Sequence, residues 1–167
     1  MASVASRRRL LMLGVPAALA GCGFELRRAP EMRFQRVQLS GFGPKSPLAQ
    51  ELRQSIDASP DTRVVDSAAQ AQVVLEALAD SRERSVVAYT STGLVREVQL
   101  RARLSFRLRT VGGAELIAAT ELLQVRELSY NEGIALAKQY EEAFQFKAMQ
   151  GDIVSQVIRR LAAVPGF

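Results

Sequence analysis

The sequence contains no histidine and no tryptophan, and its only cysteine is Cys22. Without histidine, the chain lacks the side chain that proteins use most often for acid–base chemistry near neutral pH and for binding metal ions. A single cysteine cannot close a disulfide within the chain, and the sequence contains no G-x-S-x-G, P-loop or G-x-G-x-x-G motif. These absences predict a protein that is not an enzyme and uses no metal or cofactor, and they favour a role in binding or assembly.

The chain also has little excess charge once its N-terminus is set aside. The formal net charge is +5, from 22 basic and 17 acidic residues, but three of the basic residues are Arg7, Arg8 and Arg9. Without these three, 19 basic residues face 17 acidic ones, which leaves a net charge of +2. So small an excess predicts no nucleic-acid partner.

The N-terminus has the composition of a secretory signal peptide. Three arginines, Arg7–Arg9, precede an apolar run of 11 residues, Leu10–Ala20, that ends in small residues. The run is too short for a permanent membrane helix, which needs about 20 residues. We therefore predict a cleaved signal peptide over residues 1–21, and the sequence leaves both the Sec and the twin-arginine export routes open.

The sequence LAGC, residues 19–22, resembles the lipobox of bacterial lipoproteins, in which the cysteine is acylated and becomes the new N-terminus. This resemblance implies cleavage between Gly21 and Cys22, S-diacylglycerol and N-acyl groups on Cys22, and a tether over residues 22–33. Two or three acyl chains give lasting membrane attachment, whereas one chain is marginal. Gly23 is not the aspartate that commonly marks retention at the inner membrane, so we expect the outer membrane. An unpaired thiol and an intermolecular disulfide are the alternatives for Cys22.

The next part of the chain predicts a strand, a helix and a short second strand. Residues 33–42 precede a Gly-Pro breaker and predict the first strand. Residues 46–56 predict a helix, because Ser46 can cap its N-terminus, a proline follows, and leucine or isoleucine recurs every four residues. Residues 62–66 predict the second strand.

Three longer strands should follow, separated by two turns. Residues 71–90 predict the first of them, and TSTG, Thr90–Gly93, predicts the turn after it. Residues 98–109 alternate strictly between apolar and polar side chains, which predicts a strand with one buried face. The sequence VGG, residues 111–113, predicts a turn, and residues 114–130 predict the strand that returns.

A long helix should close the chain. Ser129 and Glu132 have the S-x-x-E spacing of a capping box, and the helix should run to about Ala162. Apolar or small residues recur every three or four positions, and we expect them to form a core face along the whole helix: Tyr140, Phe144, Ala148, Gly151, Val154, Ile158 and Leu161.

The resulting order, β-α-β followed by a three-stranded meander and a long helix, predicts a single α+β domain over residues 34–167. An amphipathic helix must bury its apolar stripe against another element, and the apolar face of the strand at residues 98–109 can cover it. We therefore predict a two-layer sandwich in which two helices pack on one face of a mixed four- to five-stranded sheet.

The polar face of the alternating strand carries four arginines, which allow two interpretations. They can form ion pairs with glutamates on the returning strand, Glu115, Glu121 and Glu127, and exposed pairs of this kind contribute about 0–1 kcal/mol each. Alternatively, they can bind an anionic ligand, because the arginine fork fits phosphate and carboxylate. Single-stranded nucleic acid is disfavoured because that face has no aromatic residues for base stacking.

Four segments of the chain, taken in order, match one known family. They are LAGCGFELR after the signal peptide, GPKSPLAQELRQSI in the first helix, GLVREVQLRARLSFRL in the arginine-bearing strand, and RELSYNEGIALAKQYEEAFQFKAMQGDIVSQVIRRL at the end. Together they resemble the lipopolysaccharide-assembly lipoprotein family LptE. The likeness covers nearly the whole chain after Cys22.

The resemblance implies an outer-membrane lipoprotein that sits as a plug inside the β-barrel of a partner, LptD. The two proteins together insert lipopolysaccharide into the outer leaflet, and LptE proteins bind lipopolysaccharide and help the barrel to assemble. The expected location is the periplasmic side of the outer membrane and the barrel lumen, with a lipid anchor in the membrane. The alternative is a generic outer-membrane lipoprotein that binds a small anionic ligand or an envelope protein without a barrel partner.

The family also ties two basic positions to lipopolysaccharide binding. One falls in the ALAK segment at the start of the last helix, where this chain has Lys138. The other falls just before the glycine of the TSTG turn, where this chain has Ser91, and Arg96 is the candidate to replace the missing charge. Together with Arg101 and Arg103 on the polar strand face, Lys138 and Arg96 are the predicted contacts of the lipid A phosphates.

Overall fold

The computed structural model describes residues 31–166, which form five strands and two α-helices. One sheet holds all five strands in the order β2-β1-β3-β4-β5, with β1 parallel to both of its neighbours and β3, β4 and β5 antiparallel. Short 3-10 turns precede β3 and the last helix. The elements are β1 (Arg36–Ser40), α2 (Pro47–Asp57), β2 (Arg63–Val65), β3 (Val73–Tyr89), β4 (Val95–Thr110), β5 (Glu115–Ser129) and α3 (Ala135–Ala162).

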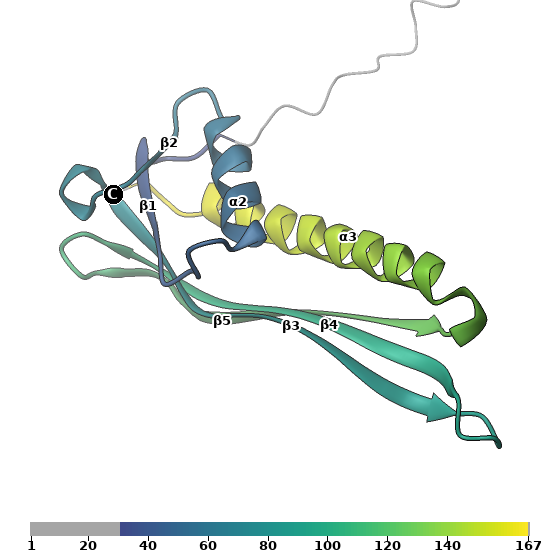
Figure 1. The fold of residues 1–167 in the computed structure, drawn as a ribbon. Helices are drawn as coiled ribbons and strands as arrows, with labels where there is room; N and C mark the ends of the chain where they lie inside the picture. Colours follow the sequence, from purple (N-terminus) through teal and green to yellow (C-terminus); the bar gives the residue numbers. More distant parts are fainter. Residues whose placement is uncertain (1–30, 167) are drawn as a thin grey trace, which may run out of the picture.

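Both helices lie on the same side of the sheet, so the predicted two-layer α+β fold with a mixed sheet is confirmed (Figure 1). The helix α3 runs lengthwise over the long strands. The helix α2 lies beside the C-terminal half of α3, next to β1 and β2 (Figure 1). The hairpin that joins β3 to β4 extends past the first turn of α3 (Figure 1). Within the described residues, no helix is both long and apolar enough to cross a membrane.

Local sequence explains how α2 begins and where the long hairpins turn. The side-chain oxygen of Ser46 accepts a hydrogen bond from the Ala49 backbone N–H at 3.1 Å, and Pro47 occupies the first helical position, as predicted. Gly93 and Gly113 have φ angles of 84° and 94°, a region that glycine enters without steric cost. The two glycines therefore fix the predicted turns before and after β4.

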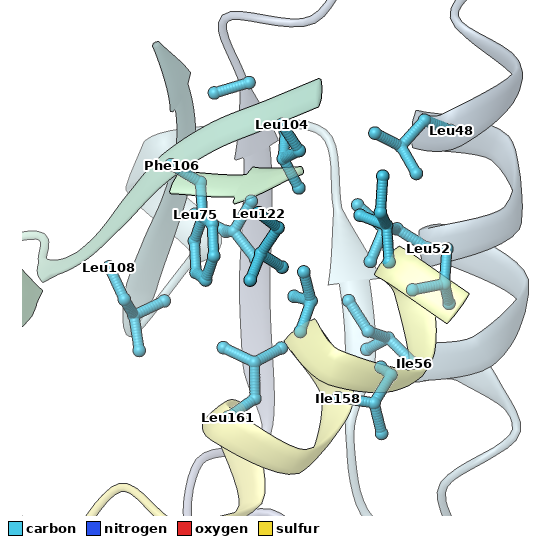
Figure 2. Packing of buried hydrophobic residues seen from close by; sticks show 14 of the residues in the cluster. Leu48, Leu52, Ile56, Leu75, Leu104, Phe106, Leu108, Leu122, Ile158 and Leu161 are labelled. Carbon is cyan, nitrogen blue, oxygen red and sulfur yellow. The ribbon is translucent and has the colours of Figure 1, made fainter. Parts of the chain in front are cut away.

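The core lies between the apolar face of β4 and the two helices. Every residue predicted to face inward on β4 is buried: Val98, Leu100, Ala102, Leu104, Phe106 and Leu108. Burying a side chain of this size contributes about 1.5–3 kcal/mol. Figure 2 shows the sheet residues meeting leucine and isoleucine side chains from both helices: Leu75, Leu104, Phe106 and Leu122 against Leu48, Leu52, Ile56, Ile158 and Leu161.

The predicted capping box at the start of the last helix is wrong. Ser129 is the final residue of β5 and pairs with Glu97 of β4, so it belongs to the sheet. The helix α3 begins only at Ala135, and its N-cap residue Ile134 makes no side-chain capping bond. The intervening turn is held instead by Asn131, whose Oδ1 accepts a hydrogen bond from the Gly133 N–H at 2.9 Å.

The predicted core face of α3 is confirmed in the C-terminal half and wrong in the N-terminal half. Val154, Ile158 and Leu161 are buried, whereas Tyr140 and Phe144 are 71% and 70% exposed. Ala148 is exposed as well. Arg82 and Arg84 of β3 lie beneath the N-terminal half, and Arg84 binds Glu142, so that part of the helix turns charged side chains toward the sheet. The buried residues of α3 are Met149, Gln150, Ile153, Val154, Val157, Ile158 and Leu161.

Candidate functional site

The structure does not bring the predicted lipopolysaccharide contacts together in one place. Arg101 and Arg103 are exposed on the face of β4 that points away from the helices, because they alternate with the buried residues of that strand. Lys138 belongs to α3, on the opposite side of the sheet. Arg96 lies five residues before Arg101, about 17 Å away along an extended strand. Cys22 and the Gly21–Cys22 bond lie outside the described residues.

Two arginines of the outer sheet face are occupied by one carboxylate. Glu76 Oε2 forms ion pairs with Arg107 Nη2 at 2.8 Å and with Arg109 Nε at 3.4 Å. The hydrogen bond from Arg107, followed by its charge and the contact with Arg109, holds the pKa of Glu76 below its ordinary value of 4.5. Glu76 lies on β3, so this ion-pair partner was missed when only the returning strand was considered.

The other two arginines of that face are held more loosely. Arg103 Nη1 lies 3.9 Å from Glu121 on β5, at the limit of an ion pair, so one of the predicted glutamate partners is confirmed. Arg101 Nε donates to Gln99 Oε1 at 2.7 Å, and Gln99 Nε2 donates to Glu127 Oε1 at 3.0 Å. Within residues 31–166, no carboxylate forms an ion pair with Arg101.

Exposed aliphatic side chains lie directly beside these two arginines. Arg101 is opposite Val125 and Arg103 is opposite Leu123 in the pairing of β4 with β5. Val125 is 42% exposed and Leu123 is 49% exposed. Side chains opposite each other on one face of an antiparallel pair are about 4.5–5.5 Å apart at Cβ. We call these four residues the outer patch, and they combine positive charge with apolar surface.

Lys138 is less available for a ligand than the outer patch. Its Nζ lies 2.8 Å from Glu141 Oε2, one turn further along α3, and its side chain is only 13% exposed. An anion that bound Lys138 would have to displace this carboxylate. Lys138 therefore remains a candidate on the family resemblance alone.

A second group of arginines, which sequence reasoning missed, lies between the sheet and α3. Arg84 Nε contacts both carboxylate oxygens of Glu142 at 3.1 Å, and its guanidinium lies 5.2 Å from the Tyr130 ring centre. Arg126 Nη2 lies 3.4 Å from Asp152 Oδ2. The Arg84–Glu142 contact joins the N-terminal half of α3 to β3 through charge, and the Arg126–Asp152 contact joins the C-terminal half to β5.

Arg82 belongs to the same group and borders a cleft between α2 and α3. It hydrogen-bonds to Gln150, which is buried and also bonds to Glu51 and, at 3.0 Å, to the Pro47 carbonyl oxygen. The cleft has a volume of about 470 Å³, and its lining includes Glu51, Arg82 and Lys147. Gln150 already bonds to both Glu51 and Arg82, so a ligand in the cleft would compete with these bonds. Among the described residues, no cluster of carboxylates could hold a metal ion.

The comparisons with known proteins identify the family. The family model for LptE, described as lipopolysaccharide-assembly, matches residues 34–161. The chain belongs to the LptE family. No curated protein sequence matches it.

Three solved structures resemble this LptE chain. Lipoprotein B from Nitrosomonas europaea is 30% identical, with a TM-score of 0.71, over 84% of this chain and 91% of that one. Rare lipoprotein B from Shewanella oneidensis is 23% identical, with a TM-score of 0.64, over 77% and 95% of the two chains. A minor lipoprotein from Acinetobacter baumannii is 16% identical, with a TM-score of 0.63, over 80% and 94%. The last two likenesses show the fold alone.

The family assignment confirms the resemblance drawn from the sequence. LptE proteins are lipopolysaccharide-assembly lipoproteins of the cell envelope and are not enzymes. The coarse function of this chain is therefore lipopolysaccharide assembly.

Proposed function

We propose that this LptE chain is an outer-membrane lipoprotein that forms a plug-and-barrel complex with an LptD-like β-barrel and helps that barrel to assemble. In this complex it binds lipopolysaccharide and assists its insertion into the outer leaflet. Acyl groups on Cys22 anchor it to the periplasmic side of the membrane, and the domain reaches into the barrel lumen. The family supports this proposal, and the observation that carries the lipid-binding part is the outer patch.

The outer patch has the chemistry that a phosphorylated lipid requires. Within residues 31–166 Arg101 forms no ion pair, and Arg103 makes only the 3.9 Å contact with Glu121. Both side chains are exposed, and a guanidinium can bind a phosphate through two parallel hydrogen bonds. Leu123 and Val125 offer apolar surface to acyl chains, each buried CH₂ contributing about 0.8 kcal/mol. Because the sheet is open, a lipid can reach this face without entering an enclosed pocket.

Binding of purified lipopolysaccharide to the full chain in detergent tests this assignment. The double variant Arg101→Gln/Arg103→Gln should bind at least tenfold more weakly, because hydrogen bonds to charged groups contribute about 1.5–3 kcal/mol each. The matched control is Arg107→Gln/Arg109→Gln, which removes the same charge from the same strand face but from arginines that Glu76 already occupies. Equal losses in the two double variants would contradict the assignment.

The two remaining candidates are tested in the same assay. Lys138→Gln and Arg96→Gln remove the charges that the family resemblance points to. Because Lys138 is paired with Glu141, Lys138→Gln should have a smaller effect than Arg101→Gln/Arg103→Gln. A larger effect would move the binding site from the outer sheet face to the start of α3.

The barrel partner is tested by co-purification of the intact lipoprotein from detergent-solubilised outer membranes. We expect recovery with one large β-barrel protein. Recovery of the lipoprotein alone, with an anionic small molecule bound in the cleft beside Arg82 and Lys147, would instead support the generic binding role.

A further inference from the structure

In the first four turns of α3, large apolar side chains face solvent and charged side chains face the sheet, the opposite of an ordinary amphipathic helix. Leu136, Tyr140 and Phe144 follow one another at intervals of four residues, so they form one line along the helix. They are 67%, 71% and 70% exposed, the highest values among the large apolar residues in the described part of the chain. We call these three residues the α3 line.

The charged residues of the same turns point the other way. Glu142 is only 14% exposed and is held by Arg84 of β3, and Lys138 is 13% exposed and is paired with Glu141. Most exposed residues of these turns are uncharged: Leu136, Ala137, Gln139, Tyr140, Ala143, Phe144 and Ala148. The exceptions are Lys147, which is exposed, and Glu141, whose side chain is 42% exposed and paired with Lys138. A helix that faces only water would carry its charges outward.

We propose that the α3 line is the surface through which this chain docks onto the wall of its β-barrel partner. The proposal rests on the plug-and-barrel complex proposed above and names the face that makes the contact. It requires an uncharged, apolar patch on the barrel. Such a patch stands out because the lumen of an outer-membrane barrel is otherwise polar.

The composition of the α3 line fits a protein partner. The centres of protein interfaces are enriched in tyrosine and phenylalanine and depleted in charge. Each aromatic side chain can bury about 150–250 Å², so the line and its neighbouring alanines supply much of the roughly 800 Å² per partner of a standard interface.

The charge pattern favours a protein over an anionic lipid. Recruitment to an anionic lipid surface relies on several basic residues, but the exposed side of these turns offers only Lys147. The exposed arginines Arg101 and Arg103 lie instead in the outer patch, on the opposite side of the sheet. The two sides of the molecule thus differ in chemistry, with the phosphorylated lipid matching one and the barrel wall matching the other.

Site-specific photo-crosslinking in intact cells tests the proposal. Benzoylphenylalanine placed at Tyr140 or at Phe144 keeps an aromatic side chain at an exposed site. The control positions, Leu78 on β3 and Val111 in the turn after β4, are also apolar and are 47% and 45% exposed. We expect crosslinks to the co-purifying barrel protein from Tyr140 and Phe144 and none from Leu78 or Val111.

A substitution provides the second measurement. Tyr140→Ser/Phe144→Ser should lower recovery of the barrel with the full-length lipoprotein at least about tenfold, as expected when interface aromatics are truncated. Its Tm should not change, because both side chains are exposed in the free domain. Leu78→Ser/Val111→Ser should leave barrel recovery unaltered.

The outcomes separate the docking surface from the function on which it rests. A barrel that co-purifies normally with Tyr140→Ser/Phe144→Ser and never crosslinks to these positions would overturn the docking surface while keeping the plug-and-barrel complex. Absence of any barrel from the wild-type preparation would overturn the complex itself. Crosslinks only to a second copy of this chain, or only to lipid, would also overturn the proposal by assigning the α3 line to a different occupant.

Discussion

At the scale of single residues, Glu76 determines which arginines of the outer sheet face are held in strong ion pairs and which can bind a ligand. It binds Arg107 and Arg109, and these contacts hold its pKa below 4.5. A carboxylate with a lowered pKa in the folded state stabilises that state above its unfolded pKa, and this contribution is lost as the pH falls through the folded pKa. Within residues 31–166 Arg101 forms no ion pair and Arg103 makes only a 3.9 Å contact with Glu121, so on this sheet face these two arginines are the more open to a ligand.

This pairing predicts how the effect of Glu76→Gln depends on pH. At pH 7 the wild type should have the higher free energy of unfolding, and the difference should shrink as the pH is lowered from 4.5 through the lowered pKa of Glu76. Urea denaturation at a series of pH values measures it. Glu115→Gln is the matched control, since Glu115 is opposite Arg109 on β5. A difference that stays constant down to acid pH would contradict the pairing.

Two phenylalanines provide a matched test of burial. Phe106 on β4 is fully buried, whereas Phe144 on α3 is 70% exposed. Phe106→Ala should lower the free energy of unfolding by about 3–5 kcal/mol, because it removes apolar contacts and leaves a cavity. Phe144→Ala should change it by less than about 0.5 kcal/mol, as surface substitutions usually do. Chemical denaturation of the two variants measures both values, and similar losses would place Phe144 in a packed site.

At the scale of elements, the sequence predicts β4 better than it predicts β3. The alternation from Val98 to Arg109 correctly assigns both faces of β4, because every second residue there is apolar and buried on the helix side. On β3, a bulge between Ala77 and Ala79 shifts the alternation by one residue and turns Arg82 and Arg84 toward α3. Such a bulge depends on pairing with a distant strand, so local periodicity cannot reveal it.

The same bulge explains why the spacing of apolar residues predicts that α3 is a long helix but does not predict which of its sides faces the sheet. The spacing of apolar residues identifies a long helix, but it does not show which stretch of sheet lies below each turn. Where that sheet is apolar, Val154, Ile158 and Leu161 are buried as predicted. Where β3 presents Arg84, the helix binds it with Glu142, and the apolar residues of those turns face outward. The α3 line is therefore visible only in the folded structure.

The two halves of α3 should consequently differ in local stability. The C-terminal half is held by buried apolar residues, whereas the N-terminal half is held by exposed or partly exposed ion pairs such as Arg84–Glu142. Amide hydrogen exchange should therefore be faster in residues 136–148 than in residues 153–161. Glu142→Gln or added salt should speed exchange in the first segment only, because a partly exposed ion pair contributes about 0.2–1 kcal/mol and is screened by salt. Uniform protection along the helix would contradict this division.

At the scale of the whole molecule, the proposed anchor and the proposed docking surface are two linked contacts with the same membrane. Acyl groups on Cys22 would hold the chain at the bilayer and keep the domain at a high local concentration near the barrel. If either contact is lost, the other should therefore still keep part of the protein at the membrane.

This linkage predicts a non-additive result for release from the membrane. Cys22→Ser should abolish labelling by a palmitate analogue, yet part of the protein should stay in the membrane fraction through the barrel. Tyr140→Ser/Phe144→Ser should lose the barrel but keep the label and the membrane location. Only the triple variant should be released fully into the soluble periplasmic fraction, because two tethered contacts dissociate far less often together than singly. Labelling that persists in Cys22→Ser would refute the lipobox assignment, and full release of that single variant would show that the barrel contact is too weak to retain the domain.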